Sequence, residues 1–121
     1  MSDELTEAMI GAAIEVHRLL GPGLLESIYE EALCHELSLR GIAAERQVEV
    51  DVIYKGIAIK GQRLDLLVEN EVVVELKAVS KLPDVAIAQA LSCLNATGLE
   101  RALLLKFGEK RLADGIKRIT L

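Results

Sequence analysis

Apolar side chains recur at three- and four-residue intervals near the N-terminus, and this period predicts two amphipathic helices. The first apolar stripe comprises Leu5, Ala8, Met9, Ala12, Ala13, Val16, Leu19 and Leu20. The second comprises Leu25, Ile28, Tyr29, Ala32, Leu33 and Leu37. The intervening Gly21-Pro22-Gly23 is a strong helix stop, and Gly41 stands where a left-handed cap would end the second helix.

The hydrophobic period changes to two further along the chain, which indicates β-strands. Strands are predicted over 47–54, 57–60, 63–68 and 72–77, with a turn at Lys55-Gly56. A third helix begins at Pro83 and ends at Gly98, and the apolar run within 101–106 suits a strand buried on both faces. Residues 116–121 predict a final edge strand. This order predicts an α/β fold, a mixed β-sheet flanked by α-helices.

The register of the central hairpin follows from the alternation of apolar residues. A three-residue turn over 69–71, with Asn70 the better left-handed residue, pairs Val68 with Val72, Leu66 with Val74 and Leu64 with Leu76. Any one-residue slip would turn the apolar side chains to the wrong face. This register places Asp65 opposite Glu75, with Cβ atoms about 4.5–5.5 Å apart.

Two opposed carboxylates destabilise a sheet unless something neutralises them. A divalent cation would do so, and carboxylate oxygens are the ligands that Mg²⁺ prefers. Lys77 lies two residues after Glu75 and shares its face, where it would orient a water or stabilise charge on a phosphate. The alternative is a solvated sheet face, but Leu67 and Val73 share that face and make it less than fully polar.

Composition limits the class of protein. The 121 residues predict one domain, 1–121, and the net charge of −5 argues against binding nucleic acid by bulk electrostatics. Cys34 and Cys93 suggest neither a disulfide framework nor a zinc site, so a reducing cytoplasm is the predicted location. The acidic first residues do not resemble a signal peptide, and no apolar stretch approaches the roughly 20 residues of a membrane span.

The segment 106–118 is locally basic within this acidic chain. Its five cations, Lys106, Lys110, Arg111, Lys117 and Arg118, outweigh Glu109 and Asp114. A solvated edge is favoured over a phosphate contact. His17, beside the first apolar stripe, is interpreted as a packed or capping residue rather than a ligand.

Several motifs together resemble one known family. Gly23-Leu24-Leu25-Glu26-Ser27-Ile28-Tyr29 matches a GxxExxY motif, and the runs Arg63–Val68 and Val73–Ala78 are similar to the same family. The chain therefore resembles the GxxExxY group of the PD-(D/E)XK nuclease superfamily over nearly its whole length. The resemblance implies a restriction-endonuclease-like core, in agreement with the predicted elements.

The resemblance also implies roles for individual residues. Asp65 and Glu75 correspond to paired metal ligands, Glu26 to the acidic residue that completes the metal site, and Lys77 to the catalytic lysine. Three further residues are candidates for substrate binding: Gln89, Arg63 and Tyr29. Arg63 is one because it shares the strand face of Asp65, where neutralising the acids is an equal alternative. Relatives often carry tyrosine four residues after the glutamine, where this chain has Cys93. For Tyr29, core packing with a hydroxyl partner is an equal alternative.

The function implied is Mg²⁺- or Mn²⁺-dependent hydrolysis of phosphodiester bonds in nucleic acid, with DNA favoured over RNA. One alternative is a non-catalytic binding or regulatory module that retains the nuclease fold, which the acidic charge and the 2% aromatic content favour. The complete Glu26, Asp65, Glu75 and Lys77 set argues against it. A second alternative is an enzyme whose substrate is a phosphoester other than nucleic acid. A domain this small rarely encloses a duplex alone, which leaves a homodimer or a partner subunit open.

Overall fold

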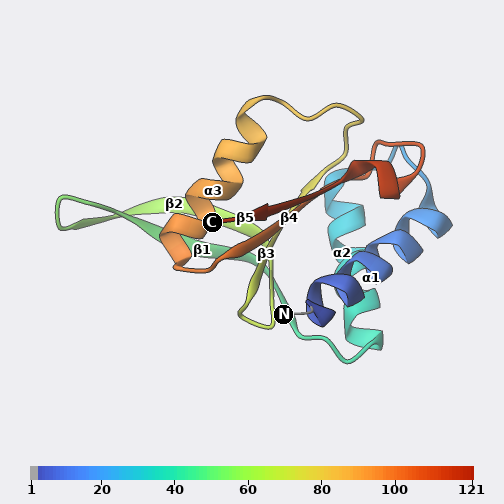
Figure 1. Cartoon of the computed structure of the whole chain (residues 1–121), viewed down its shortest axis with the longest axis horizontal. Helices are drawn as coiled ribbons and strands as arrows, with labels where there is room; N and C mark the ends of the chain where they lie inside the picture. Colours follow the sequence, from blue (N-terminus) through green and yellow to red (C-terminus); the bar gives the residue numbers. More distant parts are fainter. Residues whose placement is uncertain (1–2) are drawn as a thin grey trace.

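The computed structural model describes residues 3–121 and shows a five-stranded mixed sheet with helices on both faces (Figure 1). The elements in chain order are α1 (Glu4–Leu20), α2 (Glu26–Leu39), β1 (Ala44–Tyr54), β2 (Ile57–Val68), β3 (Val72–Lys77), α3 (Val85–Thr97), β4 (Arg101–Lys106), the short 3₁₀ helix η1 (Leu112–Gly115) and β5 (Ile116–Thr120). The predicted α/β class is confirmed.

The strands lie in the order in which they occur in the sequence. The pairs β1–β2, β2–β3 and β4–β5 are antiparallel, whereas β3 and β4 are parallel and are joined through α3. Parallel neighbours need such a crossover because the chain must return to the starting edge. As a result, β3 and β4 end side by side, with Lys77 opposite Lys106.

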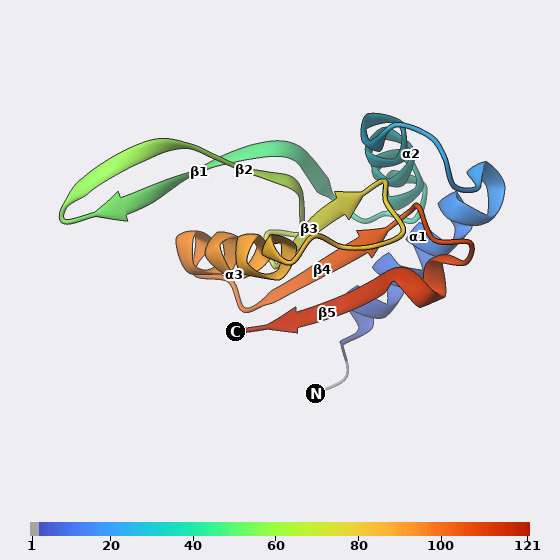
Figure 2. The ribbon, with the colours of Figure 1, turned by 90° about the horizontal axis from the view of Figure 1, so that it is seen from above.

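Alternating residues of the central strands pack into two cores. Leu66, Val74 and Leu103 contribute to the core beneath α1 and α2. Val73 and Leu104 contribute to the core beneath α3. Figure 2 shows α3 apart from α1 and α2, with the central strands between them. Two buried faces explain why four of the six residues in each of β3 and β4 are apolar.

The edges of the fold differ from the prediction. The strands predicted over 57–60 and 63–68 form one strand, β2, because the chain passes through Gly61 at φ +120° and an irregularity between Val50 and Val52 absorbs the change of register. Lys55-Gly56 forms the predicted turn, and this hairpin extends beyond α3 (Figure 1). β1 begins three residues earlier than predicted, at Ala44.

Some apolar residues of the predicted stripes are exposed. Leu19 and Leu25 belong to the helix stripes by spacing, yet they are exposed because the α1–α2 connection lies at the outer rim of the molecule (Figure 1). Among residues 3–121, none of the helices has the length and apolarity of a membrane-spanning segment.

Candidate active site

The β2–β3 hairpin has the predicted register close to its turn. Val68 pairs with Val72 and Leu66 with Val74. Glu69 and Asn70 both adopt positive φ in the turn. Non-glycine residues rarely adopt this conformation. The alternation of apolar residues was therefore sufficient to predict this part of the sheet.

Beyond Leu66 the ladder gives way to a side-chain contact. The Asp65 carboxylate accepts a hydrogen bond from the backbone N–H of Leu76, at 2.8 Å, where a continued ladder would offer a backbone carbonyl. The predicted pairing of Leu64 with Leu76 is wrong for this reason. Leu64 packs in the core beneath α3, whereas Leu76 packs beneath α1 and α2.

Glu75 lies on β3 close to Asp65. Only 9% of Glu75 is exposed. Burial, followed by the negative charge of Asp65 and a hydrogen bond with it, raises the pKa of Glu75 from 4.5 to about 8, against a smaller opposing effect of Lys77. The Cys93 thiol lies 3.7 Å from Glu75 Oε1. Two neighbouring acids of which one is buried therefore retain a proton near neutral pH.

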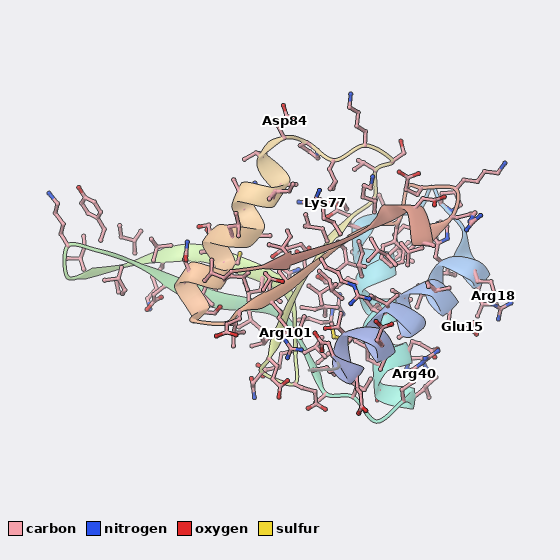
Figure 3. All side chains as sticks on the ribbon, viewed as in Figure 1. Glu15, Arg18, Arg40, Lys77, Asp84 and Arg101 are labelled. Carbon is pink, nitrogen blue, oxygen red and sulfur yellow. The ribbon has the colours of Figure 1, made fainter. Side chains whose placement is uncertain are left out.

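A cavity of about 240 Å³ opens onto Glu75 on the α3 side of the sheet. Its lining combines residues of β2, β3 and α3, namely Gln62, Arg63, Glu75, Lys77, Gln89 and Cys93. Figure 3 shows Lys77 at the end of β3, beside α3. The fold thus brings together four of the residues selected from sequence, Arg63, Glu75, Lys77 and Gln89, although they lie on three different elements.

A second cavity, of about 110 Å³, lies on the other side of Asp65. Its lining comes from α2 and the three antiparallel strands: Glu26, Ser27, Glu30, Gln47, Asp65 and Leu76. Glu26 stands in the first turn of α2, and its carboxylate accepts a 3.4 Å hydrogen bond from the N–H of Ala78, just beyond β3. Glu26 and Asp65 are therefore neighbours around one cavity, and Asp65 lies between this cavity and the Glu75 side.

Tyr29 lies apart from both cavities. It is 0% exposed and stacks on Phe107 with 4.5 Å between ring centroids. Its hydroxyl donates to the Gly21 carbonyl at 2.5 Å and accepts from the Leu24 N–H at 3.1 Å. These contacts are those of the packing alternative, and they fix the loop that leads into α2 and hence Glu26.

Some polar residues of the two cavities, among them Glu30, Gln47 and Gln62, were not selected from the sequence. Glu30 is 5% exposed and accepts hydrogen bonds from Arg46 and Gln47. Gln47 adopts φ +51° in the middle of β1, in the gap between the paired residues Arg46 and Val48. Gln62 donates to the Cys93 sulfur at 3.3 Å. The spacing of apolar residues along the chain does not identify these three residues, since the position of each depends on an irregularity of a strand or on contact with a distant element.

The donor chemistry of the site fits a divalent cation. Asp65 and Glu75 place two carboxylates side by side, the oxygen groups that such a cation prefers, and the raised pKa of Glu75 shows that a positive charge there is favoured. Within residues 3–121, however, no three acidic, histidine or cysteine side chains are grouped closely enough to hold a metal ion as the side chains stand. Glu26 shares a cavity with Asp65 but not with Glu75.

Comparison with known proteins identifies the superfamily of the chain. The profile of the PD-(D/E)XK nuclease superfamily matches residues 3–119, and the chain belongs to that superfamily. No curated protein and no solved structure gave a match. Membership implies nuclease-like chemistry on nucleic acid, and nucleases of this class generally use divalent metal ions.

Proposed function

We propose that this protein is a Mg²⁺- or Mn²⁺-dependent nuclease of the GxxExxY group that hydrolyses phosphodiester bonds in nucleic acid, DNA in preference to RNA, in the cytoplasm. The observation that carries the proposal is the approach of Asp65 to the buried Glu75 beside Lys77. A sheet interior tolerates two adjacent acids only when a proton or cation separates them.

The proposed roles follow from where each side chain lies. Asp65 and Glu75 would hold the cation, with Glu26 approaching from the first turn of α2. The cation would supply Lewis-acid stabilisation of negative charge. Lys77 lines the cavity with Glu75 and would donate to phosphate oxygens as charge grows on them. Arg63 and Gln89 supply further donors on the same wall, which would hold the strand for in-line attack by water.

A purified-protein assay tests the proposal. Single- and double-stranded DNA and RNA are incubated with Mg²⁺, with Mn²⁺ or with EDTA, and a Lys77→Ala protein prepared identically serves as the control. We expect cleavage that requires the cation and falls sharply in the control. Equal cleavage by both proteins would trace the activity to a contaminant.

One observation favours a second candidate, a binding or regulatory module without turnover. Glu26 and Glu75 line different cavities, so the third carboxylate is not assembled with the pair in this conformation. Under this alternative the wild type binds a nucleic acid tightly and never cleaves it with either cation. Its Lys77→Ala variant would then show only weaker, salt-sensitive binding.

A further inference from the structure

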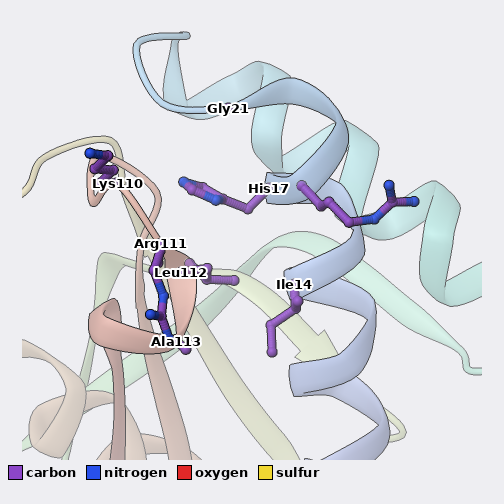
Figure 4. Close-up of a pocket in the computed structure, with 8 residues that line it drawn as sticks. Ile14, His17, Gly21, Lys110, Arg111, Leu112 and Ala113 are labelled. Atoms are coloured by element: carbon purple, nitrogen blue, oxygen red, sulfur yellow. The ribbon is translucent and has the colours of Figure 1, made fainter.

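A cavity of about 460 Å³ lies outside the candidate active site and is larger than either of its cavities. It separates the C-terminal half of α1 from the loop that leads into η1 (Figure 4). Figure 4 shows His17 and Ile14 on the helix side and Lys110 and Arg111 on the loop side. Its volume is within the range of about 300–1,000 Å³ typical of ligand sites.

The lining of this cavity is basic although the chain carries a net charge of −5. His17, Arg18, Lys110 and Arg111 contribute to it, and no acidic side chain does. Arg18 is paired with Glu15, and the contact of Arg111 with Asp114 is long, at 3.9 Å. Lys110 takes part in no ion pair within residues 3–121. The positive charge on the loop side is therefore largely uncompensated.

The two walls of the cavity differ in what they would accept. The helix side is the C-terminal end of α1, where the backbone dipole disfavours an anion, and His17 there donates through Nε2 to the Glu109 carbonyl at 2.8 Å. Ile14, 40% exposed, and the buried Leu112 supply apolar surface. A ligand with one anionic end and one apolar end fits this division, with the anion against Lys110 and Arg111.

The cavity adjoins the edge of the sheet at which Lys77 lies. The Phe107 N–H donates to the Lys77 carbonyl at 2.8 Å, and the Gly108 N–H donates to the Val79 carbonyl at 3.1 Å. The next residue, Glu109, accepts the bond from His17. The loop after β4 thus connects the end of β3, at Lys77, to the wall of the cavity.

We propose that this cavity holds one unpaired nucleotide of the strand that is cleaved, with its phosphate against Lys110 and Arg111 and its base against Ile14 and Leu112. The inference rests on the proposed function and deepens it. A base can enter the cavity only when it is not paired, so the preferred substrate is single-stranded or has a single-stranded end. The basic segment 106–118 then has its phosphate contact at Lys110 and Arg111, while Lys117 remains a solvated side chain.

Fluorescence anisotropy with a labelled single-stranded oligonucleotide, in EDTA to prevent cleavage, tests the site. Lys110→Gln should raise Kd about tenfold, as expected for losing one hydrogen bond to a charged group. It should also flatten the slope of log Kd against log salt by about 0.7, as for one lost single-strand phosphate contact. The matched variant Lys117→Gln, the same change at an exposed lysine of β5, should leave both values unchanged.

The outcomes separate this inference from the proposed function. Cleavage by the wild type together with Lys110-independent binding would overturn the inference alone. Lys110-dependent binding without cleavage would support the inference and overturn hydrolysis. If a blunt duplex bound equally tightly and its binding also depended on Lys110, the claim that the bound base is unpaired would be wrong. If AMP competed as tightly as the oligonucleotide, the claim that the nucleotide belongs to a strand would be wrong. Circular dichroism of both variants excludes misfolding as the cause.

Discussion

Two buried glutamates of this protein, Glu30 and Glu75, have opposite surroundings. Glu30 is 5% exposed and receives hydrogen bonds of 3.2 and 3.0 Å from the Arg46 guanidinium and of 2.7 Å from the Gln47 amide. Glu75 is 9% exposed and faces Asp65, which raises its pKa, and the opposing effects of Lys77 and of the Cys93 thiol are smaller.

The difference separates a carboxylate whose charge the protein pairs with a cation from one that it places beside another acid. A buried charge is stable when the protein supplies its partner, as Arg46 does for Glu30. Within residues 3–121 Glu75 forms no such ion pair, and its pKa of about 8 keeps it protonated near neutral pH. Adjacent acids without a built-in cation are a known sign of a functional site, because a bound cation or a reaction uses the unbalanced charge.

The largest expected effect is on turnover when the positively charged Lys77 side chain is removed. Lys77→Ala should lower kcat about a hundredfold to a thousandfold, by analogy with the loss of one preorganised donor. Substrate affinity should change little, since the charge that Lys77 stabilises appears only in the transition state. Steady-state kinetics measure the split, and a change confined to KM would assign Lys77 to binding instead.

The second effect concerns pH in EDTA. Because the pKa of Glu75 is raised from 4.5 to about 8, the folded protein holds a proton that the unfolded chain loses. This contribution to stability is full below about pH 4.5 and is lost as the pH rises through 8. Urea unfolding between pH 5 and 8 should show the free energy of unfolding falling by at most about 1.4 kcal/mol per pH unit.

Glu75→Gln is the matched control for the pH profile, because the amide cannot titrate. The Asp3 carboxyl adds no slope in this range, since hydrogen bonding to Arg101 lowers its pKa to about 2. An unchanged slope in Glu75→Gln would mean that another group titrates and would remove the contrast with Glu30.

The third effect is stabilisation by a cation. Mn²⁺ at a hundredfold excess over its Kd should raise the free energy of unfolding by about 2.7 kcal/mol, because it binds only the folded protein. Thermal melts with and without Mn²⁺ measure the shift. The double variant Asp65→Asn/Glu75→Gln should lose it, and an equal shift there would place the cation elsewhere.

The smallest effect is on folding when the partner of Glu30 is removed. Arg46→Ala should cost about 1–2 kcal/mol of stability, because it leaves a buried carboxylate with a single remaining donor, Gln47. Arg18→Ala, which breaks an exposed pair with Glu15 at the outer end of α1 (Figure 3), should cost less than about 0.5 kcal/mol. If Arg46→Ala cost less than Lys77→Ala in stability, Glu30 would not be the structural carboxylate of the two.

The local pattern of the chain was enough to predict much of the fold. The three-residue turn and the pairs Val68–Val72 and Leu66–Val74 followed from alternation, because a one-residue slip would expose a buried face. The helices, the final edge strand and the α/β class followed from period and from glycine and proline positions. The prediction that Asp65 approaches Glu75 also rested on this register, and the two side chains are neighbours.

By itself the sequence determined the three helices, the order of the strands and the register close to the turn, because these depend on neighbours along the chain. Only the tertiary structure decided that Asp65 captures the Leu76 amide and separates Leu64 from Leu76. It also decided that Glu30 is paired with Arg46 while Glu75 lies beside Asp65, and that Lys110 faces α1 across a cavity. These features depend on side chains from distant elements that compete for the same hydrogen bonds and space, and no periodicity along the chain encodes that competition.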